Sequence, residues 1–207
     1  RGVYQGKMGY ASTEVLDEKA LDQLVQGVVE SALISDEEEG QDIYAGEAAG
    51  AYPGVDTYNP ALEAVPPEEK LAFVLAMEEA ARQEDSRIAQ VGHNTVLTGS
   101  GAVRIVNTYG LDVAYRGNYC GAYLSPVARE GEGISTGMAL DITHDFSLLD
   151  YRNLARRGVA RAVAGLGGQP VKSGTYRVVL ENNAMADLLG AFTGVFSAEN
   201  AQHGLSL

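Results

Sequence analysis

Apolar residues recur every three or four positions in several segments of the chain, and this spacing places them on one face of an α-helix. The first stripe follows Asp17, a residue type that caps helix N-termini well. The second follows Pro66 and Pro67, because proline suits the first turn of a helix. The third follows Ser147 and Asp150, which have the spacing of a capping box. The pattern therefore predicts three amphipathic helices before residue 165.

A fourth helical stripe lies near the C-terminal end of the chain. Residues 173–180 are predicted to form a buried strand, and Asn182 or Asn183 is expected to cap the helix that follows. The stripe predicts one helix that reaches Phe196, with apolar flanks that favour burial on more than one side. Its apolar positions are Met185, Leu188, Leu189, Phe192, Val195 and Phe196.

Residues 86–146 lack a helical stripe and instead contain apolar runs broken by glycines. Short strands without an intervening helix predict a curved antiparallel meander with one face or edge available. Residues 2–13 predict an edge hairpin. Four tyrosines fall within the predicted sheet, and they could either form a platform for peptide side chains or pack across strands. They are Tyr109, Tyr115, Tyr119 and Tyr123.

Length and net charge limit the number of domains and the kinds of partner that we expect. The chain has 207 residues, enough for one large or two small domains, and a net charge of −13. Such a charge repels phosphate backbones, so we expect no nucleic-acid partner, and it suits a cationic peptide or simply solubility. No apolar run approaches the roughly 20 residues of a membrane span, so we expect no membrane partner and a cytoplasmic location. The chain opens at Arg1 in strand-like sequence, and we expect a fragment.

Few side chains have the arrangement that catalysis or metal binding requires. His93, His144 and His203 do not pair at helical spacing, so they predict no metal site. Cys120 has no neighbouring basic residue, which predicts an inert buried thiol rather than a nucleophile. The acidic run 36–39 could hold a cation, but a contiguous run is more often solvated.

The third helix carries several arginines on the side opposite its apolar stripe. These side chains could bind a carboxylate partner, but we favour a solvated face. They are Arg152, Arg156, Arg157 and Arg161.

Ordered blocks along the chain resemble the TldD/TldE family, in which TldE is also called PmbA. The first block is Gly6–Thr13 before a helix, and the second is Pro66–Lys70 leading into an Ala-rich helix. Gly174–Leu180 with Leu188–Gly190 resembles the third block, and Phe196–Asn200 resembles the next. The resemblance covers essentially the whole chain and corresponds to the middle of the family sequence.

The resemblance implies an α+β fold with an α/β N-terminal domain, in which an antiparallel curved sheet packs against helices, followed by a β-rich C-terminal domain. On this basis residues 1–34 are expected to end the first segment of the N-terminal domain. Residues 35–170 would complete that domain, and residues 171–207 would begin the C-terminal domain.

The resemblance also implies a zinc peptidase complex made of a TldD and a TldE subunit. TldD-type chains carry the zinc motif H-E-x-x-x-H after a strand and a Leu-Leu pair. Aligned through Leu188 and Leu189, the motif falls on residues 190–195, where Gly190, Ala191 and Val195 replace the histidines and the glutamate. These side chains have no lone pair to offer zinc. The chain therefore resembles the TldE branch, with no catalytic residue, no metal ligand and no cofactor of its own.

We accordingly expect a non-catalytic subunit that pairs with a TldD-like chain, the partner in which zinc is expected, and that helps to enclose an unfolded or modified peptide. The side chains expected to line the wall facing the peptide or the partner are Asn182, Asn183, Phe192 and Phe196. In isolation the chain could also form a homodimer. Two alternatives stay open: a self-sufficient metallopeptidase with ligands in a further C-terminal segment, and a binding protein without enzymatic activity that modulates DNA gyrase or an antitoxin.

Overall fold

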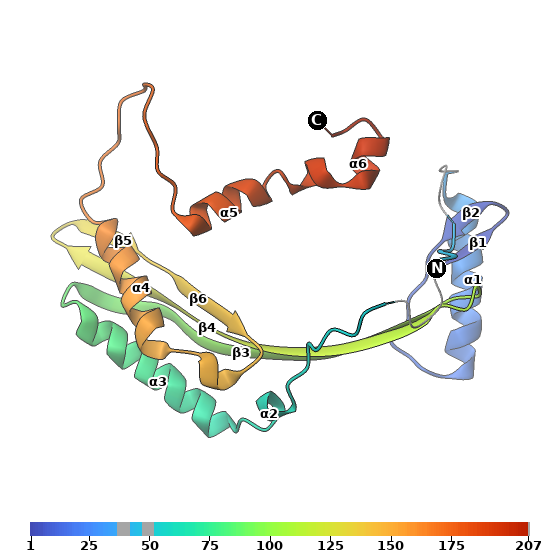
Figure 1. Ribbon diagram of the computed structural model, residues 1–207, viewed down its shortest axis with the longest axis horizontal. Helices are drawn as coiled ribbons and strands as arrows, with labels where there is room; N and C mark the ends of the chain where they lie inside the picture. The colour runs from blue at the N-terminus through green and yellow to red at the C-terminus, as the bar shows by residue number, and fades with distance from the viewer. Residues whose placement is uncertain (37–41, 47–51, 207) are drawn as a thin grey trace. The chain divides into compact units, whose positions relative to one another are not determined.

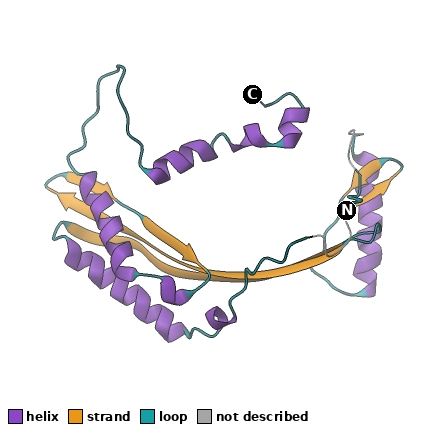
Figure 2. Ribbon diagram, viewed as in Figure 1, coloured by secondary structure: helices purple, strands orange, loops and turns teal. Residues whose placement is uncertain are grey.

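The computed structural model describes residues 1–36, 42–46 and 52–206. Contacts divide the chain into two compact units, Arg1–Gly167 and Gly168–Leu207. Most of the acidic run that we expected to be solvated, residues 37–39, lies outside the described residues. Figure 1 gives the element labels that are used below, and Figure 2 separates helices from strands.

The first unit begins with the predicted hairpin. Strands β1 (Gly2–Tyr4) and β2 (Lys7–Gly9) pair in antiparallel fashion around a turn whose two central residues have positive φ angles. Helix α1 (Glu18–Ile34) follows, and the Asp17 carboxylate accepts a 2.7 Å hydrogen bond from the Ala20 amide. The hairpin and the cap of the first helix are therefore confirmed.

The main sheet is built on a long antiparallel ribbon of β3 (Ile88–Val106) and β4 (Asp112–Glu130), each 19 residues long. Strands β5 (Gly133–Thr136) and β6 (Ala139–Thr143) both pair with β4, which widens one end of the ribbon (Figure 2). The antiparallel sheet is confirmed, but the prediction of several short strands between residues 86 and 130 is wrong.

The glycines within the ribbon explain that error, because they do not end strands. Gly99 lies opposite Tyr119, and a Cβ atom at Gly99 would come within 2.6 Å of the tyrosine ring. A glycine in a strand interior often marks such a close approach rather than a turn. The true turn lies at residues 107–111, where the Asn107 side chain accepts hydrogen bonds from the Tyr109 and Leu111 amides.

Helices α3 (Pro67–Glu84) and α4 (Tyr151–Ala164) contact each other and pack on the wide end of the sheet. The short helix α2 (Pro60–Glu63) precedes α3 in the chain. The 3-10 helix η1 (Phe146–Leu148) directly precedes α4. The core lies between this helical layer and the sheet, and its largest fully buried side chains include Met77, Leu124 and Leu154. Pro67 starts α3, as predicted from the Pro-Pro pair.

The capping box predicted for the third helix is wrong in detail. Asp150 itself is the N-cap of α4, and its carboxylate accepts hydrogen bonds from the Arg152 and Asn153 amides, each at 3.0 Å. Ser147 lies within η1 instead, and its hydroxyl donates to Asp145. A carboxylate that precedes two free helix amides is a strong cap by itself, so no second capping residue is needed.

The second unit contains α5 (Asn182–Gly190), the 3-10 helix η2 (Thr193–Phe196) and α6 (Ala198–Gln202). The predicted strand at residues 173–180 is wrong, because these residues are exposed and no described strand pairs with them. The prediction of one helix to Phe196 is also wrong. Helix α5 ends at Gly190, whose carbonyl accepts a 2.9 Å hydrogen bond from the Thr193 hydroxyl.

The α+β class, with its mixture of helices and an antiparallel sheet, is confirmed.

Every helix within the described residues is too short or too polar to traverse a lipid bilayer.

Candidate functional site

The main sheet has one face that the helices do not cover. Successive side chains of a strand point to opposite faces. In β4 the buried residues Cys120, Ala122 and Leu124 face the helical layer, so Tyr119 and Tyr123 belong to the other face. The register places residues of β3 and β6 beside them. We call this surface the open face, and its larger side chains are Leu97, Val103, Ile105, Tyr115, Tyr119, Tyr123, Leu140 and Ile142.

Side chains of the open face lie close to the small residues between them. Leu97 and Ile142 both approach Gly121, where a Cβ atom would lie 3.4 Å from each. Ile142 is 62% exposed and Tyr119 is 45% exposed, although both are large apolar groups. An extended apolar surface of this kind marks an interaction site more often than it marks a free surface.

The tyrosine pattern seen in the sequence is partly realised here. Tyr115, Tyr119 and Tyr123 lie four residues apart on one strand and therefore on one face. Tyr109 does not join them, because it belongs to the turn between β3 and β4. Cross-strand packing is confirmed for Tyr119, whose ring lies over Gly99 of the neighbouring strand, and a platform for peptide side chains stays a prediction.

A segment from outside the sheet runs along the free edge of β4. We call residues 52–60 the strap. The Asn118 amide donates to the Thr57 carbonyl at 3.0 Å, and the Thr57 hydroxyl donates to the Arg116 carbonyl at 2.8 Å. These bonds resemble the pairing of an added strand, although a side-chain hydroxyl replaces one backbone donor.

Asn118 fixes the strap in place. Its side chain is 2% exposed, and its amide group accepts from the Asn59 N–H at 2.8 Å and donates to the Asn59 carbonyl at 2.7 Å. The backbone carbonyl of Asn118 accepts a hydrogen bond from Nδ1 of His144. Both polar atoms of a buried amide are thus satisfied, as a buried polar group requires. Nδ1 of His144 therefore has a structural partner.

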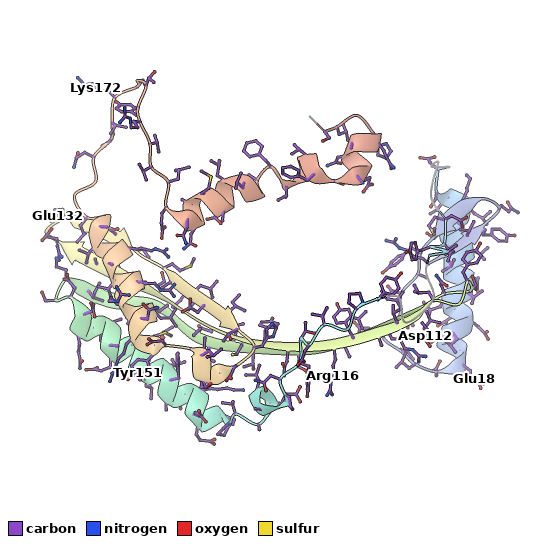
Figure 3. The ribbon with its side chains drawn as sticks, viewed as in Figure 1. Glu18, Asp112, Arg116, Glu132, Tyr151 and Lys172 are labelled. Atoms are coloured by element: carbon purple, nitrogen blue, oxygen red, sulfur yellow. The ribbon has the colours of Figure 1, made fainter. Side chains whose placement is uncertain are left out.

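A pocket of about 810 Å³ lies between the strap and the two-stranded part of the ribbon. We call it the strap pocket. Its walls are mainly aromatic and aliphatic, and Figure 3 labels Asp112 and Arg116, which lie on the β4 wall. The walls are formed by Tyr52, Pro53, Gly54, Val55, Asp56, Thr57, Tyr58, Pro60, Val103, Ile105, Asp112, Val113, Ala114, Tyr115 and Arg116.

Most charges around the strap pocket are already paired. The Arg116 guanidinium lies 3.6 Å from the centre of the Tyr58 ring. Glu63 accepts a hydrogen bond from the Tyr58 hydroxyl, which raises the pKa of Tyr58 and lowers the pKa of Glu63. Glu63 also accepts from the Ser100 hydroxyl at 2.8 Å. The strap is therefore tied to β3 and β4 by polar contacts around an apolar pocket.

The side chains predicted to form a wall lie in the second unit. Asn182 and Asn183 begin α5, whose N-cap is Glu181 rather than either asparagine. Phe192 and Phe196 lie beyond the other end of this helix and are 56% and 83% exposed. The structure thus places the two pairs at opposite ends of α5, and their role stays a prediction.

The sequence analysis did not predict the strap. The strap depends on hydrogen bonds between Asn59 and Asn118, which lie far apart in the chain, so no local sequence pattern indicates it.

The positions that would carry a zinc motif do not fit a metal. The side chains of Gly190, Ala191 and Val195 have no donor atoms. The three residues also do not share one continuous α-helix, because Gly190 ends α5, Ala191 follows it and Val195 lies in η2. Among the described residues, no three His, Cys, Asp or Glu side chains come together in a way that could hold an ion. Cys120 is fully buried, and burial raises the pKa of its thiol, which disfavours the reactive thiolate.

The arginines of α4 are only partly solvated, which corrects the prediction. Arg157 forms a 2.6 Å ion pair with Asp141 of β6, and Arg161 donates to the Met138 carbonyl at 2.7 Å. Arg156 donates to Asn153 on its own helix. Two of the four side chains thus connect α4 to β6 and to the residue before it, while both stay partly exposed.

A family model described as the PmbA/TldA metallopeptidase central domain matches residues 60–166. This range contains α3, the whole main sheet and α4. No curated protein sequence matches the chain.

Three solved structures are similar to the chain. A Thermotoga maritima protein named as a candidate modulator of a DNA gyrase is 25% identical, with a TM-score of 0.79 over 99% of this chain and 45% of that chain. A Bacteroides thetaiotaomicron protein named in the same way is 20% identical, with a TM-score of 0.78 over 96% and 46%. TldE from Thermococcus kodakarensis is 19% identical, with a TM-score of 0.65 over 79% and 36%. The chain thus spans less than half the length of each of these proteins.

Proposed function

The chain belongs to the PmbA/TldD family of metallopeptidases through its central domain, and we propose that it is part of a TldE-type, non-catalytic subunit. In this role it pairs with a TldD-like subunit that holds zinc, and the complex degrades or matures unfolded or modified peptides. We place this complex in the cytoplasm, because the buried free thiol of Cys120 suits a reducing compartment.

One observation carries the proposal. When the chain is aligned with TldD-type chains through Leu188 and Leu189, as the resemblance implies, Gly190, Ala191 and Val195 take the positions of the metal-binding histidines and the general base. Glycine, alanine and valine can neither bind zinc nor accept a proton from water. We therefore infer that these positions supply no metal site and that the TldD-like subunit holds the zinc of the complex.

The open face and the exposed aromatic residues of the second unit suit a subunit that encloses a peptide. Unfolded peptides expose apolar side chains, and an aromatic surface binds such side chains without requiring one sequence. We assign Asn182, Asn183, Phe192 and Phe196 to the wall that faces the peptide or the partner. Each is exposed in this chain.

Co-expression of the full-length protein with a TldD-like chain from the same genome tests the proposal. We expect a stable complex with zinc in the partner, and degradation of an unfolded peptide only when both chains are present. Replacement of both Phe192 and Phe196 by alanine should slow degradation without changing zinc content. Val171→Ala is the matched control, because Val171 is also exposed in the second unit.

Two results would overturn this function. Stoichiometric zinc in the purified full-length homomer would identify a self-sufficient peptidase. Failure to recover a TldD-like chain, together with no peptide degradation when one is added, would eliminate the complex.

The second candidate is a binding protein without enzymatic activity. The name of the 25% identical Thermotoga maritima relative favours it, since that protein is described as a candidate gyrase modulator. Binding of gyrase by the isolated full-length protein, without any peptidase partner, would support this second function.

A further inference from the structure

The strap pocket differs from the rest of the open face because charged groups lie beside its apolar walls. Val103, Ile105 and Tyr115 of the ribbon form one side, and the strap forms the other. A pocket of about 810 Å³ is large enough for a long side chain. The charges that line it decide which kind of side chain fits.

Two of its charged residues are already compensated within the chain. Asp112 forms a bidentate ion pair with Arg104, with distances of 2.8 and 2.7 Å. Arg116 lies over the Tyr58 ring, whose hydroxyl is bonded to the Glu63 carboxylate. A ligand that used Asp112 or Arg116 would have to displace these partners.

Asp56 is different. Within the described part of the chain, its carboxylate accepts one long hydrogen bond, from the Tyr58 amide at 3.4 Å, and forms no ion pair with a lysine or arginine. The pocket therefore combines aliphatic walls, an exposed aromatic ring at Tyr115 and one uncompensated negative charge.

We propose that the strap pocket binds a basic side chain, lysine or arginine, of an extended peptide. Its aliphatic stem packs on Val103 and Ile105, and its cation lies near Asp56 and the Tyr115 ring. Long basic side chains bury their stems on apolar surface and keep their charged ends at polar groups. Aromatic rings add attraction for a cation.

The charge of the whole chain supports a cation over an anion. A net charge of −13 raises the local concentration of cationic ligands and repels acidic ones. Asp56 is exposed, so its carboxylate is accessible to a cation of the ligand. The proposal relies on the function proposed above only in taking a peptide as the ligand.

Binding of short fluorescent peptides to the purified full chain, measured by anisotropy, tests the proposal. The peptides share one Gly/Ser sequence and differ at a central residue, which is lysine, norleucine or glutamate. Norleucine has the stem of lysine without its charge. We expect the lysine peptide to bind more tightly than the other two.

Asp56→Asn removes the charge but keeps an oxygen that can accept from the Tyr58 amide. We expect it to weaken binding of the lysine peptide by up to about fivefold, the upper end of the range for an exposed ion pair, and to leave the norleucine peptide unchanged. Asp22→Asn is the matched control, because Asp22 is an exposed carboxylate on α1 and the change in net charge is the same. Circular dichroism checks that both variants fold.

The proposal fails if norleucine binds as tightly as lysine, if glutamate binds best, or if Asp56→Asn and Asp22→Asn have the same effect. It also fails if none of the peptides binds. This assay needs no peptidase partner. A negative result here therefore leaves the TldE-type function standing, whereas failure of the complex leaves a positive peptide result standing.

Discussion

At the scale of single residues, polar side chains hold the junctions of the fold. Asp85 lies between α3 and β3, and its carboxylate accepts hydrogen bonds from the Arg87 amide and guanidinium at 2.8 to 3.0 Å. The Asp85 carbonyl accepts from the Ile88 amide, where β3 begins. The side-chain bonds to Arg87 lower the pKa of Asp85 from 3.8 to about 2.

This lowered pKa predicts a stability that depends on pH. Because the folded state binds the Asp85 proton less tightly than the unfolded state, the stabilisation is present above pH 4 and is lost as pH falls from about 4 to 2. Asp85→Asn should remove this part of the acid sensitivity. Urea unfolding at several pH values would measure it, and equal losses in the wild type and the variant between these pH values would contradict it.

At the scale of elements, α4 depends on a very close approach to the sheet. A Cβ atom at Gly137, between β5 and β6, would lie 2.1 Å from the Gly158 carbonyl oxygen and 2.4 Å from the Ala162 amide nitrogen. Both atoms belong to the backbone of α4 and cannot turn away. Only glycine allows the helix to pack at this distance.

Gly137→Ala should therefore lower the free energy of unfolding of the first unit strongly. Overpacking usually costs about 1–3 kcal/mol, and we expect a loss of this size or more. Gly101→Ala is the matched control, because nothing lies within 4 Å of a Cβ atom there. Its effect should stay within about 0.5 kcal/mol. Thermal unfolding of the two variants checks the difference, and similar melting temperatures would mean that α4 does not pack as described.

At the scale of the whole molecule, the net charge of −13 governs how ligands approach. Attraction between a strongly acidic protein and a cationic peptide acts at long range, and salt screens it over a length of roughly 8 Å at physiological ionic strength. Charge thus affects the rate of encounter more than the stability of the fold.

The association rate of a lysine-containing peptide should fall by about tenfold between 0.01 and 0.15 M salt. A norleucine peptide of the same length should show almost no change. Stopped-flow fluorescence measures both rates, and identical salt dependence for the two peptides would rule out electrostatic attraction as the cause.

The sequence by itself determined the features that depend on local chemistry. The spacing of apolar residues, the cap at Asp17 and the proline that starts α3 located α1 and α3, because a helix closes its hydrogen bonds within its own segment. The glycine, alanine and valine at residues 190, 191 and 195 have no donor atoms, which is a property of the side chains, so the prediction of no metal site there comes from the sequence and stays a prediction.

Features that depend on contacts between residues distant in sequence became known only from the tertiary structure. Residues 173–180 have the composition of a strand, but a strand forms only where another chain segment pairs with it. Gly99, Gly101, Gly117 and Gly121 did not end strands, because each pairs with a residue of the neighbouring strand. Asp56 and Tyr115 line one pocket, and the bonds between Asn59 and Asn118, residues 59 apart in the chain, hold the strap there.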